Sequence, residues 1–201
     1  MKELPYKKGF TLIELLVTIA IAAILMGVGI PSFKESIKNN RLTTLNNEFI
    51  TSLTFARSEA IKRGMTISVR KVDSNSSTNY SSTANWEDGW DVFSDNNEDG
   101  IFDAGDSLIR TYQKLPSNFT LRGNNVFQDF ISFDSTGLSS IGRFVLCDSS
   151  DGNTIPEANT SKLIMVSTGR PRIGLDTNSD GIPNTDNINS TASNITTCTP
   201  S

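Results

Sequence analysis

An apolar run near the N-terminus limits the possible folds more than any other feature of this sequence. Residues 10–30 contain a single charged side chain, Glu14, and they follow Lys7 and Lys8. As an α-helix this run is about 31 Å long, which matches the hydrocarbon core of one bilayer. The two lysines before it favour a cytoplasmic N-terminus. We therefore expect residues 10–30 to form a transmembrane helix segment.

The residues after this run differ from those of an ordinary secretory signal. Such a signal has a shorter apolar core and then a small-residue cleavage site, whereas Ile30 is followed by Pro31 and further helix-forming sequence. A carboxylate costs about 2.5–3.5 kcal/mol at a membrane centre. Glu14 is tolerated because it lies near the end of the segment, and such a residue is functional by default. The alternative is a plain signal anchor in which Glu14 has no role.

A helical pattern continues beyond the apolar run. Apolar residues recur three or four positions apart, the spacing of one helix face. They are Leu42, Leu45, Phe49, Leu53, Ala56 and Ala60. Most charged residues of this segment lie off that stripe, and Gly64 is a candidate C-terminal cap. We predict one helix from about Phe10 to Arg63, whose amphipathic continuation, residues 31–64, needs an apolar partner.

Short β-like runs supply that partner. They are separated by Gly, Asn, Asp and Ser, which favour turns. The runs lie at 66–72, 90–94, 108–115, 119–122, 131–133, 143–147 and 163–167. The polar C-terminal tail, residues 176–201, has little to bury and needs a tether to become ordered. We therefore expect an α+β fold in which the helix packs on a β-rich globular domain, residues 65–175.

Composition narrows the function classes. The chain has no histidine, which removes Ser-His-Asp and Cys-His nucleophile pairs, histidine bases and histidine metal ligands. The net charge of −4 is uneven, because residues 34–71 are basic and residues 72–201 are strongly acidic. Any site for a polyanion must therefore be local. These features predict a structural or binding protein and argue against a membrane-anchored enzyme.

The start of the apolar run resembles a known protein family. Residues 9–14, Gly-Phe-Thr-Leu-Ile-Glu, look like the class III signal of type IV pilins and type II secretion pseudopilins. Segments 55–63, 86–100 and 169–172 together resemble the FimT/GspH group of minor pilins and pseudopilins. The resemblance covers about residues 7–172 and leaves the tail unexplained. It implies a type IV pilin-like fold, with the long helix packed on antiparallel β-sheets.

The resemblance also implies how the protein matures and where it works. A prepilin peptidase would remove the prepilin leader, residues 1–9, by cleaving after Gly9, and Phe10 would become the N-methylated N-terminus. Glu14 would serve assembly by pairing with the free amine of a neighbouring subunit, since a buried carboxylate needs a cationic partner. The partners are then other pilins or pseudopilins, bound through the N-terminal helix. The protein would be a single-pass inner-membrane protein with a periplasmic domain until it joins a filament.

Two functions fit this resemblance. A FimT-like minor pilin is a structural subunit of a type IV pilus that binds DNA non-specifically for uptake in natural transformation. A GspH-like minor pseudopilin acts in pseudopilus assembly and protein secretion by the type II system. Pro31 and residues 169–172, Gly-Arg-Pro-Arg, favour the pilus.

The Gly-Arg-Pro-Arg segment is the candidate DNA contact. The resemblance assigns a Gly-Arg-x-Arg element to DNA binding. If Arg170 and Arg172 lie in an extended segment after a turn at Thr168-Gly169, their side chains share one face, and Pro171 lowers the cost of ordering them. The planar guanidinium suits phosphate. Further basic residues that can help lie in the helix: Arg57, Lys62 and Arg63. The alternative is that both arginines pair with acids of this acidic domain.

The two cysteines, Cys147 and Cys198, are expected to form a disulfide, because disulfides persist outside the inner membrane. The bridge would tie the polar tail to the strand at 143–147 and contribute about 4 kcal/mol in the chain-entropy model. Two free thiols are the alternative.

Two acidic segments raise the question of calcium. In residues 95–106, oxygen ligands stand at calcium-loop spacing with a glycine at the sixth position. The candidate ligands are Asp95, Asn97, Asp99, Asp103 and Asp106. Residues 176–181, Asp-Thr-Asn-Ser-Asp-Gly, repeat the opening of this pattern. The favoured interpretation is a polar turn between strands, so we expect no cofactor, with calcium as the alternative.

Overall fold

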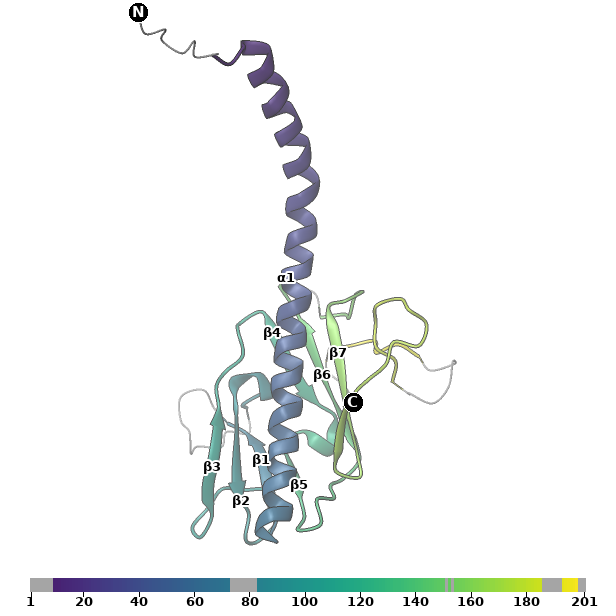
Figure 1. Ribbon diagram of the computed structural model, residues 1–201. Coiled ribbons are helices and arrows are strands. Elements are labelled where there is room, and N and C mark those ends of the chain that lie inside the picture. The colour runs from purple at the N-terminus through teal and green to yellow at the C-terminus, as the bar shows by residue number, and fades with distance from the viewer. Residues whose placement is uncertain (1–8, 73–82, 151, 153, 186–192, 199–201) are drawn as a thin grey trace, which may run out of the picture. The chain divides into compact units, whose positions relative to one another are not determined.

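The computed structural model describes residues 9–72, 83–150, 152, 154–185 and 193–198. Within them the chain forms one long helix, α1, then the strands β1 to β8 with two short 3-10 helices among them (Figure 1). The chain divides into two compact units, residues 1–38 and residues 39–201.

The first unit contains the start of α1, which spans Leu12–Arg63. The residue before the helix caps it, because the backbone N–H of Glu14 donates to Thr11 Oγ1 at 3.3 Å. The apolar side chains that follow are exposed on this single chain: Leu12 is 75% exposed and Ile24 is 69% exposed. Side chains 28–32 and 34 are not described. Among the residues that were described, no helix is long and apolar enough to cross a membrane, so the span predicted at 10–30 stays a prediction.

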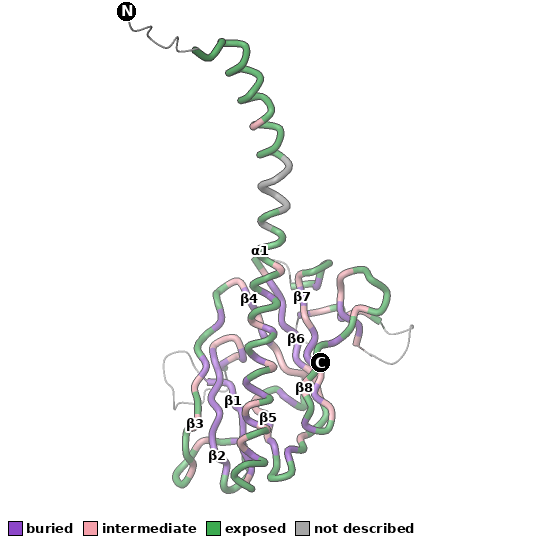
Figure 2. The backbone as a smooth tube through the Cα atoms, viewed as in Figure 1, coloured by how far each residue is buried: buried purple, intermediate pink, exposed green. Residues whose placement is uncertain are grey.

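In the second unit, the predicted apolar stripe of α1 is buried against the sheets (Figure 2). The stripe residues at 42, 49, 53, 56 and 60 are at most 1% exposed, and Leu45 packs at the edge of the core. Full burial of a large apolar side chain contributes about 1.5–3 kcal/mol. This stripe, more than helix propensity, therefore fixes the last turns of α1 on the sheets. The helix ends where predicted, with the N–H of Gly64 donating to the carbonyl of Ala60 at 2.9 Å.

The first sheet has the strand order β3-β2-β1-β5 and is antiparallel. Its strands are β1 (Ile67–Lys71), β2 (Trp90–Ser94), β3 (Ser107–Tyr112) and β5 (Phe130–Phe133). Alternate residues such as Ile67 and Val69 enter the core with α1.

The second sheet has the order β4-β6-β7-β8 and is also antiparallel. Its strands are β4 (Phe119–Gly123), β6 (Gly142–Asp148), β7 (Ser161–Ser167) and β8 (Arg170–Ile173). One face contributes alternate apolar residues to the same core as α1: Leu121, Phe144, Leu146, Ile164 and Val166. The α+β architecture with a helix on antiparallel sheets is thus confirmed, and each of the seven predicted runs coincides with a strand.

Two buried tryptophans sit at the centre of this core. The ring of Trp90 meets Phe49 edge to face at 5.0 Å between centroids, and Trp86 meets Phe144 at 5.1 Å. Both indole N–H groups have partners: Trp86 donates to the carbonyl of Phe127 at 2.9 Å and Trp90 donates to a serine hydroxyl of α1 at 3.0 Å. The tryptophans therefore pack the core and offer no stacking surface for bases.

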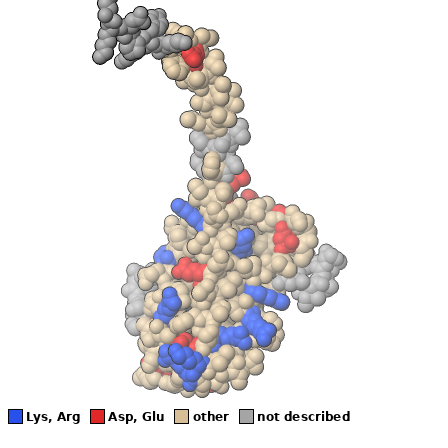
Figure 3. All heavy atoms as spheres, in the orientation of Figure 1, with Lys and Arg blue, Asp and Glu red and all other residues tan. Residues whose placement is uncertain are grey.

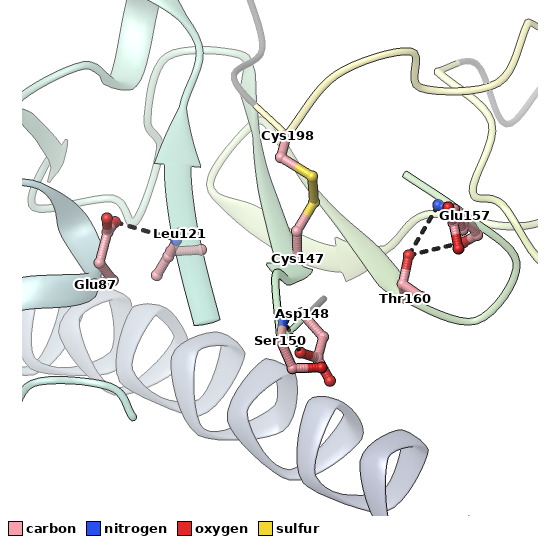
Figure 4. The surroundings of a disulfide bond; sticks show 8 residues. All are labelled: Glu87, Leu121, Cys147, Asp148, Ser150, Glu157, Thr160 and Cys198. Atoms are coloured by element: carbon pink, nitrogen blue, oxygen red, sulfur yellow. Dashed lines mark hydrogen bonds between the residues drawn. A yellow bond between two sulfur atoms is a disulfide. The ribbon is translucent and has the colours of Figure 1, made fainter. Parts of the chain in front are cut away.

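The predicted disulfide is confirmed. Cys147 on β6 is bonded to Cys198, 51 residues later, with 6.0 Å between the Cα atoms (Figure 4). Around it, Ile195 and Ile182 of the tail pack on Val145 and Leu163 of the second sheet. The bond ties down a segment with few apolar residues of its own, which is why its loop-closure contribution of about 4 kcal/mol matters.

Candidate functional site

The candidate site begins at the turn between β7 and β8. Ser167 pairs with Arg170, so Thr168 and Gly169 form a two-residue hairpin loop. Both loop residues have positive φ, 50° and 76°, as in the tight hairpin turns whose twist matches that of the strands. The turn predicted at Thr168-Gly169 is confirmed. β8 itself was not predicted as a strand, because it has only four residues and contains Pro171, which is tolerated at a sheet edge.

Gly169 is required at this turn for a second reason. A Cβ on Gly169 would lie 1.9 Å from the carbonyl oxygen of Gly137, in the loop between β5 and β6. No side chain fits in that space. The glycine of the Gly-Arg-Pro-Arg segment is therefore structural: it lets the hairpin dock on the backbone of a loop that is 32 residues away in sequence.

Arg57 of α1 contacts the same carbonyl group of Gly137. Its Nε donates to the carbonyl oxygen of Gly137 at 2.9 Å. The helix, the β5–β6 loop and the β7–β8 turn thus meet at one carbonyl group. Arg57, expected as an additional basic residue of the site, lies beside the turn and holds its supporting loop.

The other two basic residues of the helix are engaged differently. Lys62 and Arg63 both pair with Glu59, at 3.4 Å and 2.6 Å. The hydrogen bond from Arg63 is the main reason that the pKa of Glu59 is below its usual value. These exposed pairs within one helix contribute little to stability. Figure 3 shows Lys and Arg side chains gathered on the part of the globular unit where α1 ends.

Arg170 and Arg172 lie on the same face of β8, as predicted for an extended segment. Arg170 pairs with Ser167 and Arg172 with Met165 on β7, which places both arginines on one side of the second sheet. Both are exposed. Across the described part of the chain, neither forms an ion pair with an acid, so the alternative interpretation is not observed. Two guanidinium groups thus face solvent from one side of a hairpin.

The acidic segment at 95–106 forms a turn stabilised by its own carboxylates. Asp95 accepts from the N–H of Gly100 at 2.8 Å, and Asp99 accepts from the N–H of Ile101 at 2.7 Å. Asn97 donates to Asp99 and Asp103, and Asp106 accepts from two backbone N–H groups of the same loop. In the residues described, no cluster of three acidic or cysteine side chains forms a metal site. Calcium is not shown here, and the turn interpretation accounts for the hydrogen bonds.

The second acidic segment folds in the same way. Asp176 accepts from the N–H of Gly181 at 2.7 Å, and Asp180 accepts from the N–H of Ile182 at 2.9 Å. Asp180 also accepts from the side chain of Asn194, and this bond is the main reason that the pKa of Asp180 is below its usual value. The carboxylates again serve the backbone of the tail.

The residues expected to act in maturation lie at the start of the described chain. Gly9 and Phe10 are exposed and precede α1. Glu14, on the first turn, also receives a hydrogen bond at 3.5 Å from the hydroxyl of Thr11. Their accessibility suits processing, and their roles stay predictions.

A long helix packed on two antiparallel sheets, with an apolar segment that carries a glutamate near its start, defines a type IV pilin-like protein. Type II transport protein GspH is the family whose model matches residues 45–169, more than half of the chain. The chain belongs to this GspH family of minor pilins and pseudopilins. The prokaryotic N-terminal methylation motif also matches residues 4–30.

Two individual proteins are similar to parts of this chain. The type IV minor pilin FimU of Pseudomonas aeruginosa (strain PAO1) superposes with a TM-score of 0.51 at 18% identity, over 68% of this chain and 90% of FimU. That likeness shows a shared fold. Prepilin peptidase-dependent protein D of Escherichia coli (strain K12) is 38% identical over 58 residues, which are 29% of this chain and 40% of that protein. The chain thus spans less than half the length of this relative.

Proposed function

We propose that this protein is a FimT-like minor type IV pilin, a structural and non-catalytic pilus subunit that binds DNA without sequence specificity for uptake in natural transformation. The observation that carries the proposal is the pair of exposed arginines, Arg170 and Arg172, on one face of a hairpin. Gly169 lets that hairpin pack closely against the carbonyl of Gly137, and Arg57 donates a hydrogen bond to the same carbonyl. The hairpin fixes the backbone of both arginines, so little backbone entropy is lost when their guanidinium groups bind phosphate.

The rest of the chain supports a place in a filament. A prepilin peptidase would cleave after Gly9, Phe10 would be N-methylated, and the apolar helix would hold the protein in the inner membrane before assembly. Glu14 would then pair with the N-terminal amine of a neighbouring pilin. The disulfide suits a domain on the periplasmic side, where such bonds persist. Mass spectrometry of assembled protein tests this: the chain should begin at methylated Phe10, and an intact Met1 would contradict it.

The second candidate is a GspH-like minor pseudopilin of a type II secretion system. The family match at residues 45–169 favours it, because that match ends immediately before the two arginines. A pseudopilin with this fold needs no DNA contact. DNA binding therefore separates the two functions.

The test uses the full chain in non-ionic detergent with duplex DNA of mixed sequence. The wild type should bind with a micromolar Kd at low salt, and the affinity should fall steeply as salt rises, because phosphate contacts release counterions. The Arg170→Ala, Arg172→Ala double variant should lose binding and keep its melting temperature. Lys38→Ala with Arg41→Ala is the matched control, since it removes two exposed positive charges from α1.

Two outcomes would overturn the proposal. Unaltered binding in the arginine double variant would remove the hairpin from the mechanism. If the wild type binds no DNA even at low salt, the secretion pseudopilin becomes the favoured function.

A further inference from the structure

The disulfide joins two sulfur atoms that have different surroundings. Cys147 belongs to β6, which lies between β4 and β7 in the second sheet, and it is 1% exposed. Cys198 lies outside the sheets, in the polar tail, where its N–H donates to the carbonyl of Thr154 at 3.1 Å (Figure 4). One sulfur is therefore fixed by two neighbouring strands. The other is carried by an irregular segment, the kind of structure that opens locally at low cost.

The strand register places two hydroxyl groups beside Cys147. On the face that points away from α1, Cys147 pairs with Thr120 on β4 and with Ser161 on β7. The next pair along β6 is hydrogen-bonded, since the N–H of Asp148 donates to the carbonyl of Thr160 at 2.8 Å. Hydrogen-bonded and non-hydrogen-bonded pairs alternate along antiparallel strands, so Cys147 and Ser161 form a non-hydrogen-bonded pair. The side chains of such a pair lie closer together, which makes Ser161 the nearer hydroxyl.

Both hydroxyl groups are buried without a hydrogen-bond partner in the described part of the chain. They are Thr120 Oγ1 and Ser161 Oγ, and the whole of Ser161 is 1% exposed. A buried polar group without a partner is costly and uncommon in a folded protein. Sulfur in a disulfide is a weak acceptor, whereas a thiolate carries a full negative charge and accepts strongly. Both hydroxyls therefore gain a partner when the disulfide opens with the charge on Cys147.

The other neighbours of Cys147 on this face are apolar. Cys147 packs in one cluster with Val145, Leu163 and Ile195. Along β4, β6 and β7, the strand residues that point away from α1 include no acid, so no carboxylate of these strands opposes a negative charge there. A hydrogen bond to a charged group is stronger in such an apolar site than in water. The two hydroxyls are therefore the groups of the sheet that are placed to stabilise a thiolate at Cys147.

We propose that this bond is a site of thiol–disulfide exchange with an external dithiol protein, in which Cys198 forms the mixed disulfide and Cys147 is the thiolate that Ser161 and Thr120 stabilise. To open the bond, a thiolate of the partner bonds to Cys198 Sγ, the bond between the two Sγ atoms breaks, and its electron pair goes to Cys147. The second thiol of the partner then attacks the mixed disulfide. The partner leaves as a disulfide, and the two cysteines have gained two electrons and two protons.

The same steps run in reverse when the bond forms. Cys198 attacks the disulfide of an oxidising partner, Cys147 then attacks Cys198 Sγ, and the partner leaves as a dithiol. A hydroxyl donor raises the share of thiolate at Cys147 and makes this sulfur the better leaving group in the opening direction. Because the bond holds the tail on the second sheet, the exchange decides whether that sheet is covered. This inference is independent of DNA binding.

The first experiment identifies the sulfur that is attacked. The full chain in non-ionic detergent is treated with reduced glutathione under native conditions, quenched in acid, alkylated and mapped by mass spectrometry. Glutathione should be found on Cys198, and the alkyl group on Cys147. Glutathione on Cys147 would contradict the proposed roles. A mixture on both cysteines, formed at the rate of global unfolding, would also overturn the inference, because the exchange would then not use the folded sheet.

The second experiment measures the rate at which dithiothreitol reduces the bond. Ser161→Ala should slow reduction about tenfold, the effect of one hydrogen bond to a charged group. Thr120→Val keeps the shape of the side chain and should slow reduction less, because Thr120 is the more distant hydroxyl.

Ser149→Ala is the matched control. Ser149 Oγ is another buried hydroxyl without a partner in the described residues, but its N–H donates to the carbonyl of Asn118, so it lies opposite that residue and outside the row of Cys147. Reduction of this variant should proceed at the wild-type rate. If Ser161→Ala slows reduction no more than Ser149→Ala does, the hydroxyl has no part in the exchange and the inference is wrong.

Discussion

The two sheets of the globular unit are covered in different ways on the face that points away from α1. On the first sheet, the loop between β2 and β3 folds back over β2 and over β1, which pairs with β2. Phe102 of this loop meets Phe93 of β2 at 5.5 Å between ring centroids, and Arg70 of β1 donates to the carbonyl of Gly100. On the second sheet, the cover is a distant tail held by the Cys147–Cys198 bond. A loop that covers the strand directly before it needs no disulfide, because ordering a short loop costs little loop-closure entropy.

The same turn sequence serves both covers. Residues 95–101 and 176–182 both read Asp-x-Asn-x-Asp-Gly-Ile, and both use the first Asp to accept from the glycine N–H. The position of the turn relative to its sheet makes the difference. Between α1 on one face and this loop on the other, all five residues of β1 and of β2 are buried, whereas the second cover leaves Arg170 and Arg172 in solvent. The incomplete cover leaves exposed both arginines of the proposed DNA contact.

Removing the disulfide should have the largest effect, because it uncovers the second sheet and leaves the cover of the first sheet in place. Reduction, or Cys147→Ala with Cys198→Ala, should cost about 4 kcal/mol of unfolding free energy and release the tail from the second sheet. Thermal melting and limited proteolysis of the tail measure both effects. Hydrogen exchange of β1 and β2 should change only by the global loss of stability, because the cover of the first sheet is independent. Free alkylation of both cysteines without reductant would show that the bond is absent.

Gly169→Ala should have the next largest effect. The new Cβ would lie 1.9 Å from the carbonyl oxygen of Gly137, and alanine would have to adopt an unfavourable φ of 76°. We expect a loss of about 3 kcal/mol, together with weaker DNA binding as the hairpin shifts. Gly152→Ala is the matched control, since φ is 78° there and no atom lies within 4 Å of the new Cβ. The difference between the two melting temperatures isolates the close approach; equal losses would contradict its importance.

These examples show what the sequence could and could not reveal. The stripe from Leu42 to Ala60 and the strands were predictable, because periodicity is a local property. The pairing of Cys147 with Cys198 followed from there being only two cysteines. The meeting of Arg57, Gly137 and Gly169 was not predictable, since it depends on how three segments pack.

Asp91 gives a smaller, pH-dependent contrast between the covered sheet and an open loop. It lies on β2 under the cover of the first sheet, and burial raises its pKa, against a hydrogen bond from Thr111 that lowers it. The Asp91 carboxyl group therefore stabilises the fold in its protonated form, and this contribution is lost as pH rises through the raised pKa. Asp91→Asn should raise the melting temperature at neutral pH, and the gain should vanish in acid.

The pKa of Asp134, in the β5–β6 loop, is shifted in the opposite direction. Hydrogen bonds from Thr136 and from the N–H of Leu138 lower its pKa, so its stabilising effect is present near neutral pH and is lost as pH falls through the lowered value. Asp134→Asn should therefore lower the melting temperature at neutral pH and have little effect in strong acid. Melting curves from about pH 3 to 7 test both variants. Parallel pH profiles for the two would contradict the assignment of opposite shifts.

The smallest predicted effect concerns the β7–β8 turn of the second sheet and leaves the arginines of that sheet unchanged. Thr168 has a φ of 50°, which is strained for a β-branched residue, and it occupies the first position of a two-residue hairpin loop. Asparagine tolerates this conformation, and Asn-Gly is the preferred pair for such turns. Thr168→Asn should therefore stabilise the fold by about 0.5–1 kcal/mol and raise the melting temperature by a few degrees. DNA affinity and its salt slope should stay at wild-type values, because Arg170 and Arg172 are unchanged. The hydroxyl of Thr168 donates to the carbonyl of Ser167 at 2.7 Å. A lower melting temperature for the variant would show that this hydrogen bond outweighs the backbone strain.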